Sequence, residues 1–418
     1  MFIIYDIIFL IVAVAYLPYL ALKRKWHAGL WTRFGFTLKK DGGDRKTVWV
    51  HAVSVGEVLL ALNLIEKIRE RFPGHRIVLS TVTVTGHALA CQRLQDSCLV
   101  IYAPFDFSWV VRKYVSVLNP AFYISVETEI WPNLFACLQD RNVPIIEVNG
   151  RISDTAFVGY RRISFLIRGV LRGVRVFCMQ TEADARRIIQ LGADPRKVRV
   201  VGNLKFDSLR PERSFRKEDI GFQSDDQLLI AGSTYPGEDE IVMDVYQSLT
   251  TEFPRLRLVI VPRHVERADE IARSCQFKGL TPRKLSQNSP GAPLDAAAVV
   301  IVDRIGYLRG LYSLADVAFV GKSLRGNGGQ NMIEPLFLGR PTIVGPHTQN
   351  FRDIVRIFMP TGALIVVKTL EEFVGKLRDL LNDPAHCTKL GLAAQKEIAR
   401  HQGATEKTLM AIEEILGA

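Results

Sequence analysis

The chain has 418 residues, of which 48% are hydrophobic and 23% are charged, as is typical of a globular protein with a normal core. Its length favours two domains over one. The formal net charge of +11 indicates an anionic partner, such as nucleic acid, an anionic membrane surface or a phosphorylated substrate. The sequence contains neither GxGxxG nor GxxxxGK followed by Ser or Thr, so a Rossmann dehydrogenase and a P-loop NTPase lose their main support.

The N-terminal 22 residues are almost wholly apolar, with breaks at Asp6 and Pro18, and Lys23-Arg24-Lys25 follows at once. About 20 apolar residues suffice to span a bilayer, and a following basic cluster marks the cytosolic side. Because the charge comes after the apolar run and not before it, residues 1–25 are predicted to be an uncleaved membrane anchor, with the remainder cytosolic. The alternative is a buried core helix or an interfacial helix, since Asp6 and Pro18 make a poor span.

Six cysteines stand at positions 91, 98, 137, 178, 275 and 387. They show no CxxC or Cys/His metal spacing. This pattern predicts reduced, buried thiols in the cytosol and argues against a structural zinc.

From Thr47 onward, apolar runs alternate with helical patterns, which predicts βαβ units and parallel sheets. The expected strands are 47–52, 76–82, 99–102, 121–126, 144–148, 174–178 and 198–202, then 228–232, 257–262, 298–302, 316–320, 341–345 and 363–367. The prediction is an α/β protein with two Rossmann-like, doubly wound domains, 40–205 and 227–418, that face each other across a cleft. A polar linker, 206–226, joins them, and the last helix can pack back on the first domain.

The first candidate site residue, Glu57, lies in the stretch HAVSVGEVLL from His51 to Leu60. A strand, a glycine-bearing turn and a helix start are where open α/β sheets bind ligands. Gly56 is expected to allow close backbone approach or a positive φ. The alternative is that Glu57 only complements the helix dipole.

Two further stretches place charged groups near strand ends. Glu127 and Glu129 follow the strand 121–126, and the strand alternation predicts that both face the cleft. Their alternative is a helix cap or a salt bridge. Lys205 lies at the domain junction, where a lysine can reach a phosphate, and its alternative is a solvated linker side chain.

The second half carries three more stretches after apolar runs, AGSTYPGE (231–238), VPRH (261–264) and GGQNMIEP (328–335). The first is expected to present N–H groups to an anion. Arg263 is suited to a phosphate or base, and Glu334 to the two hydroxyls of a ribose. In the first half, arginines from Arg161 to Arg175 predict one basic helical face for anionic headgroups or acceptor phosphates, unless that face is simply solvated.

The ordered stretches HAVSVGE, VETEIWPN, NLKFD, AGSTYPGEDE, VPRH, GGQNMIEP and GPHTQNF resemble the 3-deoxy-D-manno-octulosonic acid (Kdo) transferases of Gram-negative lipopolysaccharide synthesis. The resemblance covers nearly the whole chain. It implies the GT-B glycosyltransferase fold, a catalytic base at Glu57, and transition-state stabilisers at Glu127 and Lys205. It also implies cytidine nucleotide contacts at Pro262, Arg263, Ile305, Gly306, Tyr307, Asn331, Met332, Ile333 and Glu334. The chain departs from the usual family residues at Tyr235, Tyr307 and Gln330, and it reads NMIE where the family often has NPLE.

The resemblance further implies an inverting transfer of Kdo from CMP-Kdo to the lipid A precursor (lipid IVA), without a metal or another cofactor. The implied location is the cytoplasmic face of the inner membrane. No RNA- or DNA-binding motif is present, so nucleic acid is not expected as a partner. Two alternatives stay open: a GT-B transferase that uses another nucleotide sugar, and a membrane-tethered, non-catalytic lipid-A-binding protein.

Overall fold

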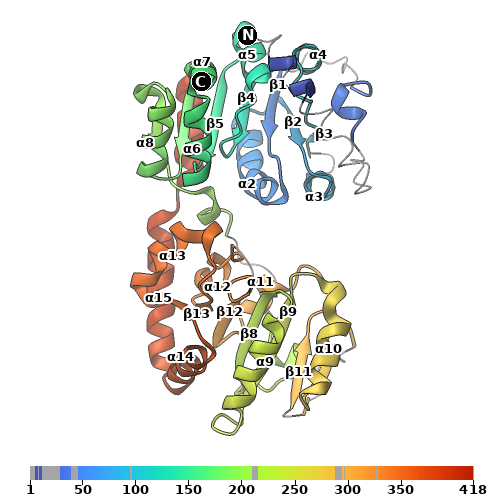
Figure 1. Cartoon of the computed structure of the whole chain (residues 1–418), viewed down its shortest axis with the longest axis vertical. Helices are drawn as coiled ribbons and strands as arrows, with labels where there is room; N and C mark the ends of the chain where they lie inside the picture. Colours follow the sequence, from blue (N-terminus) through green and yellow to red (C-terminus); the bar gives the residue numbers. More distant parts are fainter. Residues whose placement is uncertain are drawn as a thin grey trace. The chain divides into compact units, whose positions relative to one another are not determined.

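The computed structural model describes residues 5–7, 9–11, 29–38, 46–94, 97–209, 215–287, 294–295, 297–325 and 328–417. Within these residues the chain forms two compact units. Unit 1 runs to Ser208 and includes the C-terminal residues from His401, while unit 2 runs from Leu209 to Arg400. Each unit consists of a parallel sheet with helices packed on it (Figure 1).

The sheet of unit 1 has seven parallel strands in the order β3-β2-β1-β4-β5-β6-β7. The strands are β1 (Thr47–His51), β2 (Arg76–Thr81), β3 (Leu99–Tyr102), β4 (Pro120–Val126), β5 (Ile145–Gly150), β6 (Val176–Met179) and β7 (Val198–Val200). His51 pairs in register with Ser80 of β2 and Ser125 of β4. The loops after these strands therefore leave the sheet at one edge.

Helices cover both faces of this sheet. One core cluster joins the sheet to α2 (Val55–Arg71), α3 (Val84–Leu94) and α16 (Ala404–Leu416), and a second joins it to α4 (Ser108–Leu118), α5 (Pro132–Asp140), α7 (Ser164–Arg172) and α8 (Glu182–Leu191). A further helix is α6 (Asp154–Arg162), and short 3-10 turns are η1 (Thr32–Phe34), η3 (Pro195–Lys197) and η4 (Leu204–Phe206). In α2 the buried positions recur every three or four residues, so this helix presents one apolar stripe to the core.

Unit 2 has the strand order β10-β11-β9-β8-β12-β13-β14. Its strands are β8 (Gln227–Thr234), β9 (Leu256–Pro262), β10 (Thr281–Lys284), β11 (Ala298–Ile301), β12 (Val317–Val320), β13 (Thr342–Val344) and β14 (Leu364–Val366). Its helices are α9 (Glu238–Leu249), α10 (Ala268–Phe277), α11 (Leu308–Tyr312), α12 (Ile333–Phe337), α13 (Arg352–Phe358), α14 (Leu370–Asn382) and α15 (Pro384–His401). Five 3-10 turns are η5 (Lys217–Ile220), η6 (Val265–Arg267), η7 (Leu285–Gln287), η8 (Gln349–Phe351) and η9 (Met359–Thr361).

The predicted α/β class and the two parallel sheets are confirmed, and every expected strand is present within a few residues. One observed strand was not predicted, β10, with the sequence TPRK. It pairs with β11 alone at the edge of its sheet. Edge strands tolerate proline and charge because one side of the strand makes no ladder bonds, so β10 has no apolar pattern by which it could be recognised.

Three other expectations need correction or lie outside the description. The single basic helix is wrong, because the chain breaks at Ile163 into α6 and α7, and Arg175 lies beyond both. All six cysteines are free, but Cys91 is exposed and Cys387 half-buried. Most of the expected anchor lies outside the described residues, and none of the described helices is long and apolar enough to cross a bilayer.

Candidate active site

The strand order of unit 1 reverses direction between β1 and β4, since β2 and β3 lie on one side and β5 to β7 on the other. In open α/β sheets, ligands bind at this switch point, outside the carboxyl ends of the strands. The loop after β1 leads to Glu57, and the loop after β4 begins with Glu127. The topology therefore places two of the predicted site residues at the preferred ligand position of the fold.

Glu57 is only 8% exposed and its carboxylate is held by its own loop. The Val53 N–H donates to Oε2 at 2.6 Å, and the Ser54 hydroxyl donates to Oε1 at 2.8 Å. The carboxylate therefore does stabilise the start of α2, which is part of the alternative interpretation that Glu57 only complements the helix dipole. Each carboxylate oxygen can accept a second hydrogen bond, so this role leaves Glu57 able to take a proton.

Burial raises the pKa of Glu57 to about 7, while the Val53 hydrogen bond opposes the shift and the charge of Glu127 adds to it. A carboxylate with this pKa is a stronger base than an ordinary glutamate and is still largely ionised just above neutral pH. Gly56 has the helical backbone of α2 and not a positive φ. A side chain there would meet only Ser54 Oγ at 3.9 Å, so the approach to the helix start beside Glu57 is open.

The loop from Glu127 to Trp131 leaves β4 through a strained residue. Glu127 has a φ of 63°, a conformation that costs a non-glycine residue about 1 kcal/mol or more and is found at functional sites. β4 ends at Val126, and the Glu129 N–H donates to Glu127 O at 3.2 Å. The expected strand alternation of Glu127 and Glu129 is therefore wrong, because both lie in a turn.

Glu129 nevertheless belongs to the same electrostatic group. Burial, together with the charges of Glu57 and Glu127, raises the pKa of Glu129 to about 7. Burial lowers the pKa of Lys205, while the charges of Glu127 and Glu57 oppose that shift. The structure thus brings the three predicted residues within electrostatic range of one another. Glu129 lies within the same range, since its pKa responds to the charges of Glu57 and Glu127.

Lys205 is positioned by a chain of amide residues, Asn149 near the end of β5, Gln180 just after β6 and Asn203 after β7. Gln180 Nε2 donates to Asn149 O at 2.9 Å, and Asn203 Nδ2 donates to Gln180 Oε1 at 2.9 Å. The Leu204 N–H then donates to Asn149 Oδ1, and the Lys205 N–H to Asn203 Oδ1, each at 2.9 Å. Sequence reasoning missed this chain, although an amide residue soon after each apolar strand was a visible signal.

The histidine that opens the first motif is excluded as an acid–base group. His51 is 1% exposed and its Nδ1 lies 2.8 Å from Ser80 Oγ. Burial, reinforced by the charge of Arg33, lowers the pKa of His51 to about 3. It is neutral at physiological pH, which leaves the carboxylates as the titrating groups of this edge.

Unit 2 has its own switch point, between β8 and β12. Gly321 lies there, and a Cβ at this position would come within 2.5 Å of Ser233 O, so only glycine fits.

The expectation that the loop after β8 presents its N–H groups to an external anion is wrong in part. The buried Glu238 carboxylate accepts hydrogen bonds from the amides of Tyr235, Lys322, Ser323 and Leu324 at 2.6–2.9 Å.

The residues implied for the cytidine nucleotide lie at the end of β9, after β11 and around the start of α12. Arg263 is exposed just past Pro262, and Ile305 is 85% exposed beside Gly306 and Tyr307. Asn331 Nδ2 donates to Glu334 Oε1 at 3.1 Å, and Arg309 pairs with the same oxygen at 3.2 Å. Met332 and Ile333 are at most 1% exposed, so their side chains belong to the core and only their main chain can meet a ligand.

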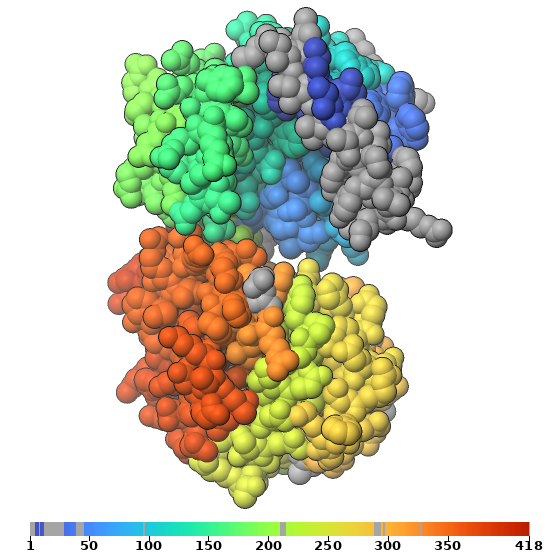
Figure 2. All heavy atoms as spheres, viewed as in Figure 1, coloured from blue at the N-terminus to red at the C-terminus, as the bar shows by residue number. Residues whose placement is uncertain are grey.

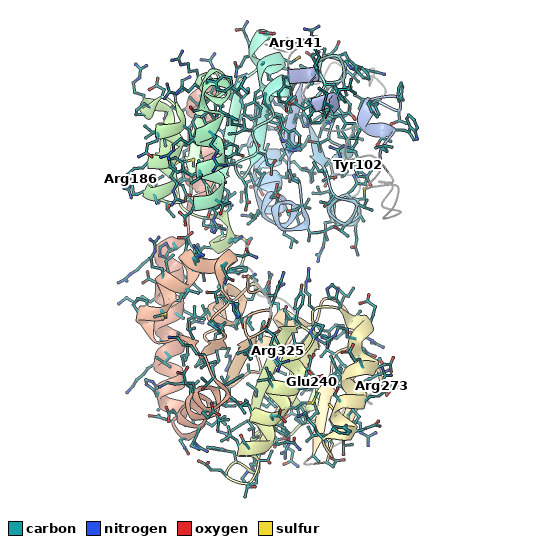
Figure 3. The ribbon with its side chains drawn as sticks, viewed as in Figure 1. Tyr102, Arg141, Arg186, Glu240, Arg273 and Arg325 are labelled. Atoms are coloured by element: carbon teal, nitrogen blue, oxygen red, sulfur yellow. The ribbon has the colours of Figure 1, made fainter. Side chains whose placement is uncertain are left out.

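Two of the positions where the chain departs from the usual family residues meet in space. Gln330 Nε2 donates to the Tyr235 hydroxyl at 3.5 Å. The Lys322 ammonium lies 5.2 Å from the centre of the Tyr235 ring, and the His264 ring packs edge-on against it at 5.8 Å. A Cβ at Gly237 would come within 3.0 Å of the Arg325 side chain, and Arg325 is labelled in Figure 3. Tyr235 and Gln330 therefore form one local surface, which the sequence could not reveal.

Relatives of known name match most of the chain. The family model described as 3-deoxy-D-manno-octulosonic-acid transferase (kdotransferase) matches residues 28–208. The 3-deoxy-D-manno-octulosonic acid transferase of Bordetella pertussis is 34% identical over 88% of this chain and 87% of the relative. That of Haemophilus influenzae is 31% identical over 90% and 89%. A bifunctional glycosyltransferase/methyltransferase of Fusobacterium nucleatum is 35% identical over 91% of this chain, which spans 59% of that relative.

Solved structures share the fold at low sequence identity. A putative UDP-N-acetylglucosamine 2-epimerase from Listeria monocytogenes aligns with a TM-score of 0.59 at 14% identity, over 88% of this chain and 96% of that one. A glycosyltransferase from Rickettsia africae gives 0.57 at 14%, over 90% and 99%. MurG from Acinetobacter baumannii gives 0.52 at 12%, over 88% and 99%. Together with the two seven-stranded parallel sheets, these likenesses assign the GT-B fold.

Proposed function

The chain belongs to the 3-deoxy-D-manno-octulosonic acid (Kdo) transferase family, and from that membership we propose that it moves Kdo from CMP-Kdo to the lipid A precursor. In this role it is an inverting GT-B glycosyltransferase of lipopolysaccharide synthesis. One observation carries the proposal beyond family membership. A buried carboxylate with a raised pKa, Glu57, lies at the switch point of unit 1 within electrostatic range of Glu127 and Lys205.

The reaction needs a base because a sugar hydroxyl is a weak nucleophile at neutral pH. In the proposed step Glu57 takes the acceptor hydroxyl proton while the oxygen bonds to the anomeric carbon of Kdo. The bond from that carbon to the CMP oxygen breaks, and CMP leaves with the electron pair. Burial raises the pKa of Glu57 to about 7, which favours proton uptake during attack.

Glu127 and Lys205 are assigned electrostatic roles. The anomeric carbon gains positive character as CMP departs, and the Glu127 carboxylate offsets it. Lys205 stabilises the leaving phosphate, because a preorganised charge acts strongly where water is excluded. Its placement by the amide chain of Asn149, Gln180 and Asn203 supports this role.

Donor recognition is assigned to unit 2, with Arg263, Asn331 and Glu334 as side-chain contacts and Pro262, Met332 and Ile333 as main-chain contacts. Ile305 to Tyr307 is a further proposed contact. CMP-Kdo has a single phosphate between cytidine and sugar, so the proposed reaction requires no metal to bridge two phosphates.

The acceptor, lipid IVA, is proposed to be reached at the cytoplasmic face of the inner membrane. An aromatic surface on unit 1 supports this location: Trp31, Phe36 and Trp109 are 68%, 65% and 53% exposed. Phe34 packs against all three rings at centroid distances of 6.0–6.4 Å, and Lys113 lies 5.7 Å over the Phe36 ring. Exposed tryptophans with adjacent cations suit the headgroup region of an anionic bilayer.

A turnover assay separates the proposed donor from its alternatives. The full chain is incubated with tetra-acylated lipid A precursor and either CMP-Kdo or UDP-sugars, and added sugars are counted by mass. Kdo addition with CMP release is expected for CMP-Kdo alone. Turnover of a UDP-sugar would identify another GT-B transferase, and lipid binding without CMP release would identify a binding protein.

The role of Glu57 is tested with Glu57→Gln, which keeps the size of the side chain and an acceptor for Val53. We expect kcat to fall roughly 100-fold or more, the scale of general-base loss. Because the ionised form is the base, wild-type kcat/KM is expected to rise with pH and level off above about 7, and the variant is expected to lose this rise. Glu70→Gln, at the exposed end of the same helix, is the control. A Glu57→Gln enzyme with wild-type turnover would refute the assignment.

A further inference from the structure

The N-terminal segment, residues 5–7 and 9–11, is helical and docks on unit 1 through one carboxylate. Asp6 Oδ1 accepts the Ser108 N–H at 3.0 Å and Asn133 Nδ2 at 2.7 Å, and Asp6 Oδ2 accepts the Ser108 hydroxyl at 2.6 Å. The acid that seemed to spoil an apolar span therefore caps α4 and reaches the first turn of α5. In Figure 1 the dark-blue N-terminal residues lie beside these two helices.

The segment has two faces although its sequence is almost wholly apolar. Tyr5 hydrogen-bonds Asp106, and the Phe9 ring packs edge-on against Phe107 at 4.9 Å. Side chains on the other side are exposed: Ile7, Leu10 and Ile11 at 53%, 52% and 62%. Figure 2 shows dark-blue atoms of the segment at the surface of unit 1. The docked face therefore makes defined hydrogen bonds and a ring contact with unit 1, while the outer face is apolar.

Asn133 is the junction between this segment and the start of α5. It is 2% exposed, and its Nδ2 donates to Asp106 O at 2.6 Å as well as to Asp6. The Asp106 carboxylate accepts the N–H groups of Asn133 and Leu134 at 3.1 and 2.9 Å. Two acids from distant parts of the chain therefore set where α5 begins.

The loop Glu127–Trp131 is held from two sides. Upstream, the Thr128 hydroxyl accepts the Arg151 N–H and donates to Glu147 Oε1, each at 3.0 Å. Downstream, the loop runs directly into Pro132 and Asn133, where Asp106 and Asp6 bind. Movement of Asn133 would be passed along a few bonds to Glu129 and Glu127. The N-terminal segment therefore forms part of the downstream support of this loop.

We propose that Asp6 and Asn133 are positioning residues that couple docking of the N-terminal segment to the geometry of the Glu127–Trp131 loop. The coupling rests on the proposed function insofar as that loop carries catalytic groups. The coupling between segment and loop does not itself depend on a catalytic role, because it concerns only whether the loop is held in place.

The test uses the full chain in detergent, with Asp6→Ala, Asp6→Asn and Ser108→Ala, and with Glu70→Ala, which removes an exposed acid of α2, as the control. Asp6→Asn retains an acceptor for the Ser108 N–H and Asn133, and Ser108→Ala removes only the hydroxyl bond. Amide hydrogen exchange of peptides covering 104–110 and 127–135, kcat and KM for CMP-Kdo, and the unfolding midpoint are measured for each.

For Asp6→Ala we expect faster exchange in both peptides and unchanged exchange in β8. We expect kcat to fall roughly ten- to 100-fold, the scale caused by misplacing groups around a reacting centre, with an unchanged KM for CMP-Kdo. Ser108→Ala should change amide exchange and kcat less than Asp6→Ala does. Asp6→Asn should bring both close to their wild-type values. Wild-type exchange in Asp6→Ala would overturn the coupling, and faster exchange with wild-type kcat would overturn the positioning role. If the proposed function is wrong, the wild type will show no Kdo transfer. The exchange data alone then decide whether the segment holds the loop.

Discussion

At the scale of single residues, the edge of unit 1 is notable for an acid that is fully buried and uncharged. Glu147 is 0% exposed, and burial raises its pKa to about 8, although the Thr128 hydroxyl bond opposes the shift. It is therefore protonated at neutral pH and supports the Glu127 loop as a neutral group. A raised pKa means that the folded chain holds this proton more tightly than the unfolded chain does.

Glu147→Gln tests this state, because glutamine stays neutral at every pH. The stability that wild type gains from protonated Glu147 is fully present below the unfolded pKa of 4.5 and is lost as pH rises through about 8. Relative to the variant, the wild-type unfolding midpoint should fall between pH 5 and 8, by ~2–4 °C for each kcal/mol, and stay constant above pH 8. Thermal unfolding of both proteins at several pH values measures this difference. A constant difference from pH 5 to 8 would mean that Glu147 is ionised throughout.

At the scale of elements, α16 closes unit 1 beside Lys205. The Asp207 carboxylate accepts the Gly403 N–H at 2.7 Å and the Thr405 N–H at 2.5 Å, which caps the first turn of α16. Gln402 Nε2 donates to Phe206 O at 3.2 Å. The surface pairs of Arg71 and Arg199 with acids of α16 add little, since exposed ion pairs contribute at most about 1 kcal/mol.

Asp207→Ala should loosen α16 and the turn that carries Lys205. Loss of a helix cap that binds two amides costs about 1–2 kcal/mol, and we expect a matching fall in the free energy of unfolding together with a lower kcat. Asp207→Asn keeps one good acceptor, so its free energy of unfolding and its kcat should lie between those of the wild type and Asp207→Ala. Urea unfolding and turnover measure both effects. Unchanged kcat despite lower stability would separate α16 from the position of Lys205.

At the scale of the whole molecule, the net charge of +11 and the aromatic surface of unit 1 point to the same partner. In the proposed function, the positive charge would draw the chain to an anionic bilayer, where tryptophan and phenylalanine side chains suit the interface. The exposed outer face of the N-terminal segment adds apolar area to this unit, since Phe9 contacts Phe107 and Phe107 contacts Trp109. The membrane is therefore expected to lie against this part of unit 1.

A double variant, Trp31→Ala with Trp109→Ala, tests that surface. The apparent KM for lipid acceptor in vesicles that contain phosphatidylglycerol should rise several-fold, because each exposed aromatic ring contributes contact with the interface. We expect kcat at saturating acceptor to be unchanged. Phe277→Ala, at an aromatic residue 93% exposed on α10 of unit 2, is the control. An unchanged KM in the double variant would place the membrane contact elsewhere.

Much of the fold could be predicted from local pattern. Apolar runs such as Val48 to Val50 and Leu258 to Val261 are strands because a parallel strand is buried on both faces, and the alternation with helices implied two doubly wound units. Ordered motifs at strand ends predicted Glu57, Glu127 and Lys205 as site residues, and the structure brings the three within electrostatic range of one another. The helix break at Ile163 was not predictable, since no proline marks it. The edge strand β10 was not predictable because its sequence, TPRK, has no apolar period.

The sequence by itself determined the class of fold, the number of units and the family, because hydrophobic period and motif order are local properties of the chain. Only the tertiary structure decided which distant residues meet. Asp6 caps α4 some hundred positions away, Asp207 caps α16, and Glu147 is buried beneath the Glu127 loop. The physical reason is that a hydrogen bond or a pKa shift depends on distance and burial in space, which strand order and helix packing set and no local pattern records.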